Sequence, residues 1–363
     1  MDTNIGAKER VTQNRLIGLF KNVLKYTYLG NWETREDNAN IEEKLLTAYL
    51  SRRGYTDKEI RSSIVKLKQS ANSLGGGLYN ANKEVYTFLR YGVNIQAEVT
   101  EKKKMVHLID WANPMENDFQ IAEEVTIQGA SDRRPDLVVY VNGIALAVIE
   151  LKRSTVSAHE GIRQNIRNQQ DGYIPRFFTT IQLLFAGNDT EGLHYGVIKT
   201  PEKFWLRWKE PCGEPCQPSH FTAKEYPNEL DRSVLQFFEP VRLLEYIHDF
   251  IIFDGGIKKT ARPNQYFAVK AAQPRVRKKQ NGIIWHSQGS GKSLTMVWLA
   301  QWIRENVSDA RVVIITDRDE LDKQIESGFK DVGEQIQRAK SGGKLIELSL
   351  IHISEPTRLA LIS

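Results

Sequence analysis

Cysteine is scarce in this chain, which has only Cys212 and Cys216 among its 363 residues. Two thiols cannot build the disulfide framework of a small secreted domain, so a reducing compartment is expected. No apolar run reaches the roughly 18 residues that a membrane-spanning helix needs, and the N-terminus lacks the apolar core of a signal peptide. We therefore expect a cytoplasmic protein without a membrane partner.

The chain also has only a small excess of positive over negative charge. The formal net charge is +5 at pH 7, which permits nucleic-acid binding but does not by itself argue for it. Hydrophobic residues make up 40% of the chain and charged residues 26%, as in ordinary globular proteins. The length allows two domains, or three.

A glycine-rich loop between a predicted strand (282–285) and a predicted helix (from 294) is the most informative feature present. Glycines let such a loop turn its N–H groups towards a phosphate, and the N-terminus of the following helix adds to the anion site. The pattern is G-x-x-x-x-G-K-[ST] with His286 in place of the first glycine. A chance glycine turn is the alternative, and the flanking elements argue against it. We expect ATP to bind Gly289, Ser290, Gly291, Lys292 and Ser293, with Lys292 on the β- and γ-phosphates and the Ser293 hydroxyl on Mg²⁺.

A second pattern lies upstream, on a predicted β-hairpin. Asp136 precedes the strand 137–141, and Glu150 and Lys152 end the strand 144–151 and its continuation. Asn142-Gly143 is a strong signal for a two-residue turn between them. Pairing of the two strands then places Asp136 beside Glu150, and the two-residue period places Glu150 and Lys152 on one face.

Two carboxylates a few ångströms apart suit Mg²⁺, which prefers oxygen ligands. The metal would polarise a phosphodiester and activate a water, while Lys152 would orient or deprotonate that water and stabilise negative charge. This is the PD-(D/E)xK pattern of metal-dependent nucleases, with Asp136 and Glu150 as metal ligands. The pattern alone is weak, because E-x-K is common at exposed strand ends. Gln169 and Tyr173, four residues apart, are further candidates for the catalytic site and are expected to share a face of the helix that follows. Glu43 is a weaker candidate for a further carboxylate.

The segments around the glycine loop extend the motif. The run 262–269 lies upstream of it and the run 315–324 downstream. Together they resemble the first motifs of superfamily 2 helicases and translocases. The resemblance implies that Gln265 contacts the adenine of ATP and that Thr316-Asp317-Arg318 approaches the DNA backbone. A plain helix surface and an ordinary strand–helix turn are the alternatives for these two segments.

These parts, in this order, resemble the restriction (R) subunit of type I restriction–modification enzymes. The resemblance covers the chain to about residue 345 and includes the runs 133–136, 148–152, 169–173, 196–208 and 284–293. It implies ATP-driven translocation of double-stranded DNA coupled to Mg²⁺-dependent double-strand cleavage. It also implies methyltransferase (M) and specificity (S) subunits as partners.

The expected fold is therefore α/β. We expect a PD-(D/E)xK nuclease domain over residues 1–233, with a mixed central sheet flanked by helices, and the start of a first RecA-like P-loop lobe over 234–347. The sequence ends before any acidic D-E-x-H type motif or second motor lobe, so this fragment is expected to be inactive as an ATPase. Residues 348–363 do not follow the family and are expected to be a non-native or disordered tail.

Two other functions stay open at this point. One is a superfamily 2 DNA helicase whose N-terminal domain only binds DNA or a partner, and the other is a standalone ATPase without a nucleic-acid role. A separation of Asp136 from Glu150 of more than about 8 Å would favour the helicase, because one Mg²⁺ at ~2.1 Å from each ligand could not bridge them.

Overall fold

The computed structural model describes residues 5–96, 103–211, 219–315, 336–339, 343 and 359–362. The chain divides into two compact units. One consists of Met1–Trp208 and His220–His248, and the other of Lys209–Ser219 and Asp249–Ser363. The expected division at residue 233 into a nuclease and a motor domain remains a prediction.

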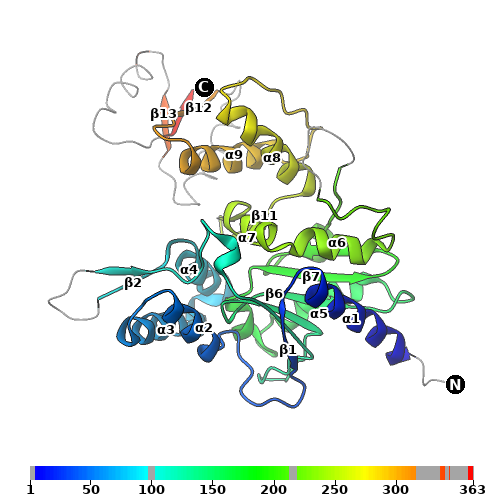
Figure 1. The fold of residues 1–363 in the computed structure, drawn as a ribbon. Coiled ribbons are helices and arrows are strands. Elements are labelled where there is room, and N and C mark those ends of the chain that lie inside the picture. The colour runs from blue at the N-terminus through cyan, green and yellow to red at the C-terminus, as the bar shows by residue number, and fades with distance from the viewer. Residues whose placement is uncertain are drawn as a thin grey trace. The chain divides into compact units, whose positions relative to one another are not determined.

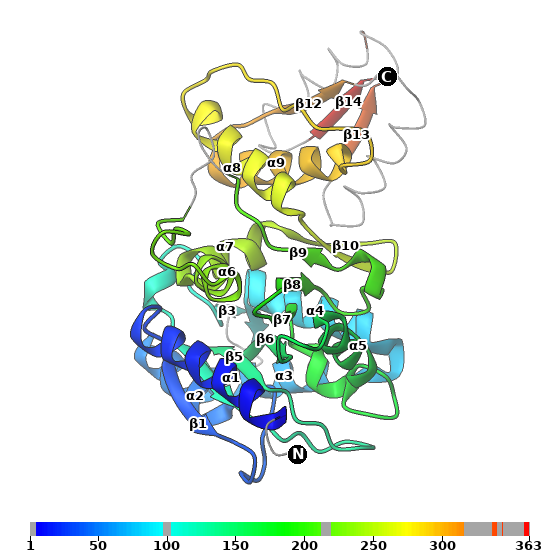
Figure 2. The same cartoon turned by 90° about the vertical axis from the view of Figure 1, so that its right-hand side faces the viewer.

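The first unit is built on a mixed sheet of seven strands (Figures 1 and 2). The pairs β1–β4 and β6–β7 are parallel, and the other neighbours are antiparallel. Every residue of the central strands β5, β6 and β7 is buried, because helices cover both faces. This confirms the expected α/β fold with a mixed central sheet. In order across the sheet, the strands are β1 (Thr27–Asn31), β4 (Phe119–Glu123), β5 (Leu137–Val141), β6 (Ile144–Leu151), β7 (Leu183–Asn188), β8 (Gly192–Gly196) and β9 (Leu206–Arg207).

Two groups of helices enclose this sheet. Helix α1 contacts β1, β6 and α6, whereas α5 packs on β6 and β7 from the opposite side (Figure 2). The helices α2, α3 and α4 form a separate layer beside the short hairpin of β2 (Val93–Ile95) and β3 (Lys104–Val106). No helix among the described residues is long and apolar enough to span a membrane. The helices of this unit are α1 (Ile5–Asn22), α2 (Glu43–Arg52), α3 (Asp57–Asn72), α4 (Gly77–Tyr91), α5 (Ala158–Asn168), α6 (Glu229–Phe238) and α7 (Pro240–Asp249), with 3-10 turns η1 (Leu74–Gly76), η2 (Pro114–Glu116), η3 (Pro175–Thr179) and η4 (Glu202–Phe204).

The hairpin of β5 and β6 has the bounds that the sequence predicts. Asn142 and Gly143 both have positive φ, 53° and 80°, as a two-residue hairpin turn requires. The strands pair Leu137 with Ile149, and a register shift follows between Val139 and Tyr140. The turn and the register together fix which residues lie opposite one another at the far end of the hairpin.

The second unit contains α8 (Pro263–Arg277) packed against α9 (Lys292–Asn306), and a hairpin of β10 (Ile251–Asp254) and β11 (Ile257–Thr260). Strands β12 (Val312–Ile315) and β13 (Ile336–Ala339) lie on either side of β14 (Leu359–Ile362), all parallel. Strand β14 falls within the expected tail, whose residues 348–358 and 363 lie outside the described part. The non-native origin of that tail stays a prediction.

The predicted strand 282–285 is wrong for this structure. The segment has no regular secondary structure, and the side chains of Ile283 and Trp285 are each 91% exposed. An apolar run becomes a strand only where a neighbouring strand receives its backbone hydrogen bonds. No strand in the described residues pairs with this run.

Gly161 allows α5 to approach the end of β6 closely. A Cβ at this position would lie 3.1 Å from the Cβ of Ala186 and 3.3 Å from the Cβ of Glu150. We expect Gly161→Val to lower the free energy of unfolding by about 1–3 kcal/mol, because the helix would be pushed off the sheet. Chemical denaturation measures this, and Gly172→Val is the matched control because nothing lies within 4 Å of an added Cβ there. Equal effects of the two substitutions would contradict the close approach.

Candidate active site

The structure brings Asp136, Glu150 and Lys152 together at one end of the hairpin. Asp136 immediately precedes β5, and the pairing of Leu137 with Ile149 places it opposite Glu150 near the end of β6. The backbone N–H of Leu151 donates to Asp136 Oδ2 at 2.6 Å. Lys152 follows β6, and its backbone N–H donates to the carbonyl of Gly187 at 3.0 Å. Backbone hydrogen bonds therefore fix the Asp136 carboxylate and the main chain at Lys152.

The two carboxyl groups lie in a poorly solvated place. Glu150 is fully buried, and burial, followed by repulsion from Asp136, raises its pKa well above the usual range. Burial also raises the pKa of Asp136 to about 6, against the opposing effect of Lys152 and the Leu151 N–H. Each acid thus resists ionisation unless a positive charge is near.

Lys152 keeps its charge in this environment. Burial lowers the pKa of its ammonium, but Asp136, Glu150 and Glu9 outweigh that effect and raise it overall. Its Nζ donates to the Leu151 carbonyl at 2.7 Å and lies 3.4 Å from Glu9 Oε1. Glu9 belongs to α1 and lies 143 residues before Lys152 in the sequence.

One oxygen of Glu150 has a donor and the other does not. Oε2 accepts a hydrogen bond from Gln164 Nε2 at 2.7 Å, whereas no N–H or O–H donor among the described residues reaches the buried Oε1. The Asp136 carboxyl lies within hydrogen-bonding range of Glu150, so the two acids face each other. Buried polar atoms are nearly always satisfied, so a carboxyl oxygen that has no donor and faces a second acid indicates that a proton or a cation is held between the two. Asp136 and Glu150 fit a divalent cation that takes oxygen ligands, such as Mg²⁺.

Removing one of these acids should stabilise the metal-free chain. The pKa of Asp136 in the folded chain, about 6, lies above its ordinary value of 3.8. The folded state therefore holds this proton more tightly than the unfolded state does, and the free energy of unfolding falls as the pH rises through this range. Asp136→Asn keeps an oxygen for the Leu151 N–H without this cost. At pH 8 with EDTA we expect a free energy of unfolding about 1–3 kcal/mol higher than that of the wild type. Urea denaturation at pH 8 and pH 4 tests this. The gain should disappear at pH 4, and a loss at pH 8 would contradict the picture of an acid held against its preference.

The structure does not place Gln169 and Tyr173 as predicted. Helix α5 ends at Asn168, so the two residues do not share a helical face. Gln169 donates to the Asn165 carbonyl at 2.9 Å and accepts from the Lys199 N–H at 2.7 Å, and Tyr173 lies in a turn with the Arg133 guanidinium 4.2 Å from its ring centre. Neither side chain makes a hydrogen bond to Asp136 or Glu150.

Gln164 is the residue that sequence reasoning missed. It lies three residues after Gly161, and this spacing places it on the face of α5 that meets Glu150. Glu43 is likewise no third carboxylate, since it pairs with Lys68 at the turn end of the hairpin, where its helix approaches Gly143.

The glycine loop has the backbone conformation and the following helix that a phosphate-binding loop needs. Gly289 and Gly291 have positive φ, 77° and 83°, and α9 begins directly after them at Lys292. In this conformation Lys292 Nζ donates to the carbonyls of His286 and Ser287 at 2.8 and 3.1 Å. The ammonium therefore occupies the loop's own acceptors, which a phosphate would have to replace. Ser290 Oγ also donates to Ser287, at 2.7 Å.

Gln265 and Arg262 lie against this loop. The Gln265 amide donates to the Gly291 carbonyl at 2.8 Å and accepts from the Arg262 N–H at 2.8 Å, while the Arg262 side chain reaches the Gly289 carbonyl at 3.4 Å. Gln265 is buried with its oxygen and nitrogen both engaged, so in this conformation it supports the loop. The predicted element Thr316-Asp317-Arg318 lies outside the described residues.

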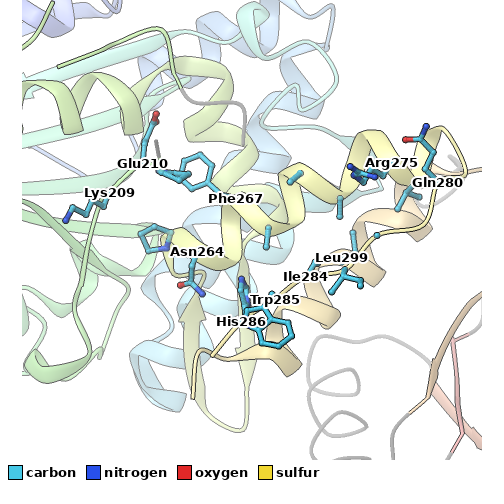
Figure 3. Close-up of a pocket in the computed structure, with 18 residues that line it drawn as sticks. Lys209, Glu210, Asn264, Phe267, Arg275, Gln280, Ile284, Trp285, His286 and Leu299 are labelled. Atoms are coloured by element: carbon cyan, nitrogen blue, oxygen red, sulfur yellow. The ribbon is translucent and has the colours of Figure 1, made fainter. Parts of the chain in front are cut away.

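A cavity of about 1030 Å³ adjoins α8 in the same unit (Figure 3). Asn264 and Phe267 line it from α8, and Ile284, Trp285 and His286 line it from the segment before the glycine loop. None of the residues from Gly289 to Ser293 lines it. The cavity thus lies along the unpaired segment and outside the expected phosphate site.

Comparison with known proteins adds an independent line of evidence. The family model "Type I restriction enzyme R protein N terminus" matches residues 7–203, and the model "SWI2/SNF2 ATPase" matches residues 264–362. A putative type I restriction enzyme endonuclease subunit, MjaIXP, of Methanocaldococcus jannaschii is 27% identical over 380 residues, covering 94% of this chain and 36% of that protein. The HindI endonuclease subunit of Haemophilus influenzae is 27% identical over 294 residues, covering 75% of this chain and 27% of that protein.

The chain thus spans between about a quarter and just over a third of the length of the curated relatives it matches. The first family model alone accounts for more than half of its residues. That span includes Asp136, Glu150 and Lys152, the same residues that meet at the end of the hairpin. The chain therefore belongs to the type I restriction enzyme R protein N-terminal family.

Proposed function

We propose that this chain is the N-terminal part of a type I restriction endonuclease subunit that cuts double-stranded DNA at Asp136, Glu150 and Lys152. Residues 1–233 are the nuclease domain in this proposal, and residues 234–347 begin a motor that uses ATP to translocate DNA. The observation that carries the proposal is the buried acid pair, in which no donor reaches Glu150 Oε1 and the pKa values of both carboxyl groups are raised.

The residues of the pair have complementary roles. Asp136 and Glu150 would hold Mg²⁺, which when bound polarises the scissile phosphate and lowers the pKa of a water. Gln164 and the Leu151 N–H each fix one carboxylate oxygen, so the remaining oxygens are left for the ion. The Lys152 ammonium supplies a positive charge beside them, where negative charge develops on the phosphate during cleavage.

The motor site rests on the glycine loop. Lys292 would leave the loop carbonyls for the β- and γ-phosphates of ATP, and the Ser293 hydroxyl would contact the accompanying Mg²⁺. Gln265 would contact the adenine after releasing Gly291. Gly289, Ser290 and Gly291 supply the backbone N–H groups around the phosphates.

The partners follow from the family. The named relatives are endonuclease subunits of type I restriction enzymes, and we propose methyltransferase and specificity subunits as partners that supply the DNA address. The proposed location is the cytoplasm. This fragment itself is proposed to be inactive as an ATPase.

The test is DNA cleavage by the complete enzyme, assembled from the full-length subunit and its partners. Unmethylated DNA should be cut in the presence of ATP and Mg²⁺. An enzyme that translocates DNA without ever breaking it would instead support the helicase whose N-terminal domain only binds.

A further inference from the structure

The ammonium of Lys152 is paired with an acid that is not one of the two expected metal ligands. Its Nζ lies 3.4 Å from Glu9 Oε1, and among the described residues neither Asp136 nor Glu150 forms an ion pair with it. The Lys152 side chain is only 15% exposed and that of Glu9 32%, so the pair is partly shielded from solvent. The sequence places Glu9 far from the hairpin.

Helix α1 holds Glu9 in this place through its next residues. Gln13 Nε2 donates to Glu123 Oε2 at 2.9 Å, and Arg10 lies 3.2 Å from the same carboxylate. Glu123 is buried at the end of β4, next to β5 in the sheet. The first described turns of α1 are thus fixed to the edge of the sheet from which Asp136 projects.

Lysine would otherwise be a competitor at the metal site. Its ammonium is a compact charge on a flexible four-carbon stem, and Lys152 is two residues from Glu150. The carboxyl groups of Asp136 and Glu150 face each other, and no donor reaches the buried Glu150 Oε1, so this place suits a positive charge. An ammonium that moved between the two carboxylates would satisfy Glu150 Oε1 and exclude a divalent ion.

We propose that Glu9 is a positioning residue that holds the Lys152 ammonium beside the Asp136–Glu150 pair and out of the place of the metal ion. The inference rests on the proposed nuclease function. Glu9 acts here through Lys152 and is not a ligand of the metal ion.

Calorimetric titration of the 363-residue chain with Mn²⁺ tests this without DNA or ATP. The variants are Glu9→Gln, Lys152→Met and the double variant. We expect Glu9→Gln alone to weaken Mn²⁺ binding about tenfold, because the released ammonium competes with the ion. Lys152→Met should bind at least as tightly as the wild type, and adding Glu9→Gln to it should change the affinity less than about threefold.

Three results would overturn the inference. An equal loss with and without Lys152 would mean that Glu9 acts on the ion directly. Full affinity in Glu9→Gln, or a loss matched by the control Glu160→Gln, an exposed acid on α5, would remove any specific role. Thermal unfolding of each variant separates these effects from misfolding. If Asp136→Asn leaves Mn²⁺ binding unchanged, the proposed nuclease site itself fails, which is a different outcome from failure of Glu9→Gln alone.

Discussion

Asp136→Asn and Glu150→Gln, each introduced into the complete enzyme, should lower the rate of DNA cleavage by at least about 10³-fold, while DNA-stimulated ATP hydrolysis stays within about twofold of the wild type. The amides retain oxygen atoms for the Leu151 N–H and for Gln164, so the hydrogen bonds in this structure can persist. The negative charges that would bind the ion are lost. The glycine loop belongs to the other compact unit, which explains why ATP hydrolysis should survive.

Cleavage of a plasmid with one recognition site, run beside an ATPase assay, measures both activities. Glu160→Gln is the matched control, because Glu160 is exposed on the same α5 that carries Gln164 and its carboxylate pairs with Arg163. Full cleavage by both variants would show that Asp136 and Glu150 do not carry out the cleavage. Loss of ATP hydrolysis along with cleavage would show that the two sites are not separate.

Lys292→Ala should abolish ATP hydrolysis and, with it, cleavage remote from the recognition sequence. Lys292 is the first residue of α9, and its ammonium already lies against the loop carbonyls of His286 and Ser287. Alanine removes the charge that would neutralise the β- and γ-phosphates, so we expect a loss of at least about 10²-fold in the ATPase rate. Single-molecule translocation or triplex displacement measures the movement directly.

Lys278→Ala provides the control, because Lys278 is an exposed lysine at the end of α8. It should leave both activities near those of the wild type. Cleavage that persists in Lys292→Ala without translocation would contradict the coupling of nuclease to motor. Asp136→Asn and Lys292→Ala together assign DNA cleavage and ATP hydrolysis each to one compact unit.

The sequence predicts the hairpin well because its determinants are local. Asn142 and Gly143 adopt the positive φ that the turn needs, and the register then brings Asp136 to Glu150 without further information. The glycine loop followed by a helix is local in the same sense. Patterns of this kind depend on a few neighbouring residues, so they survive in a single sequence.

Other parts of the site depend on contacts between distant segments. The choice of Gln164 over Gln169 is decided by where α5 ends and by its close approach to β6 at Gly161. Glu9 reaches Lys152 only because α1 docks on the sheet, and no spacing rule connects residues so far apart. The predicted strand 282–285 does not form for the same reason, because a strand needs a neighbouring strand to receive its backbone hydrogen bonds.

The most direct test of the account is anomalous diffraction from crystals of this chain grown with Mn²⁺. We expect one strong peak at about 2.1–2.3 Å from a carboxylate oxygen of Asp136 and from Glu150 Oε1, with the Lys152 ammonium still beside Glu9. A lattice with Mn²⁺ bound elsewhere and none between these two carboxylates would contradict it.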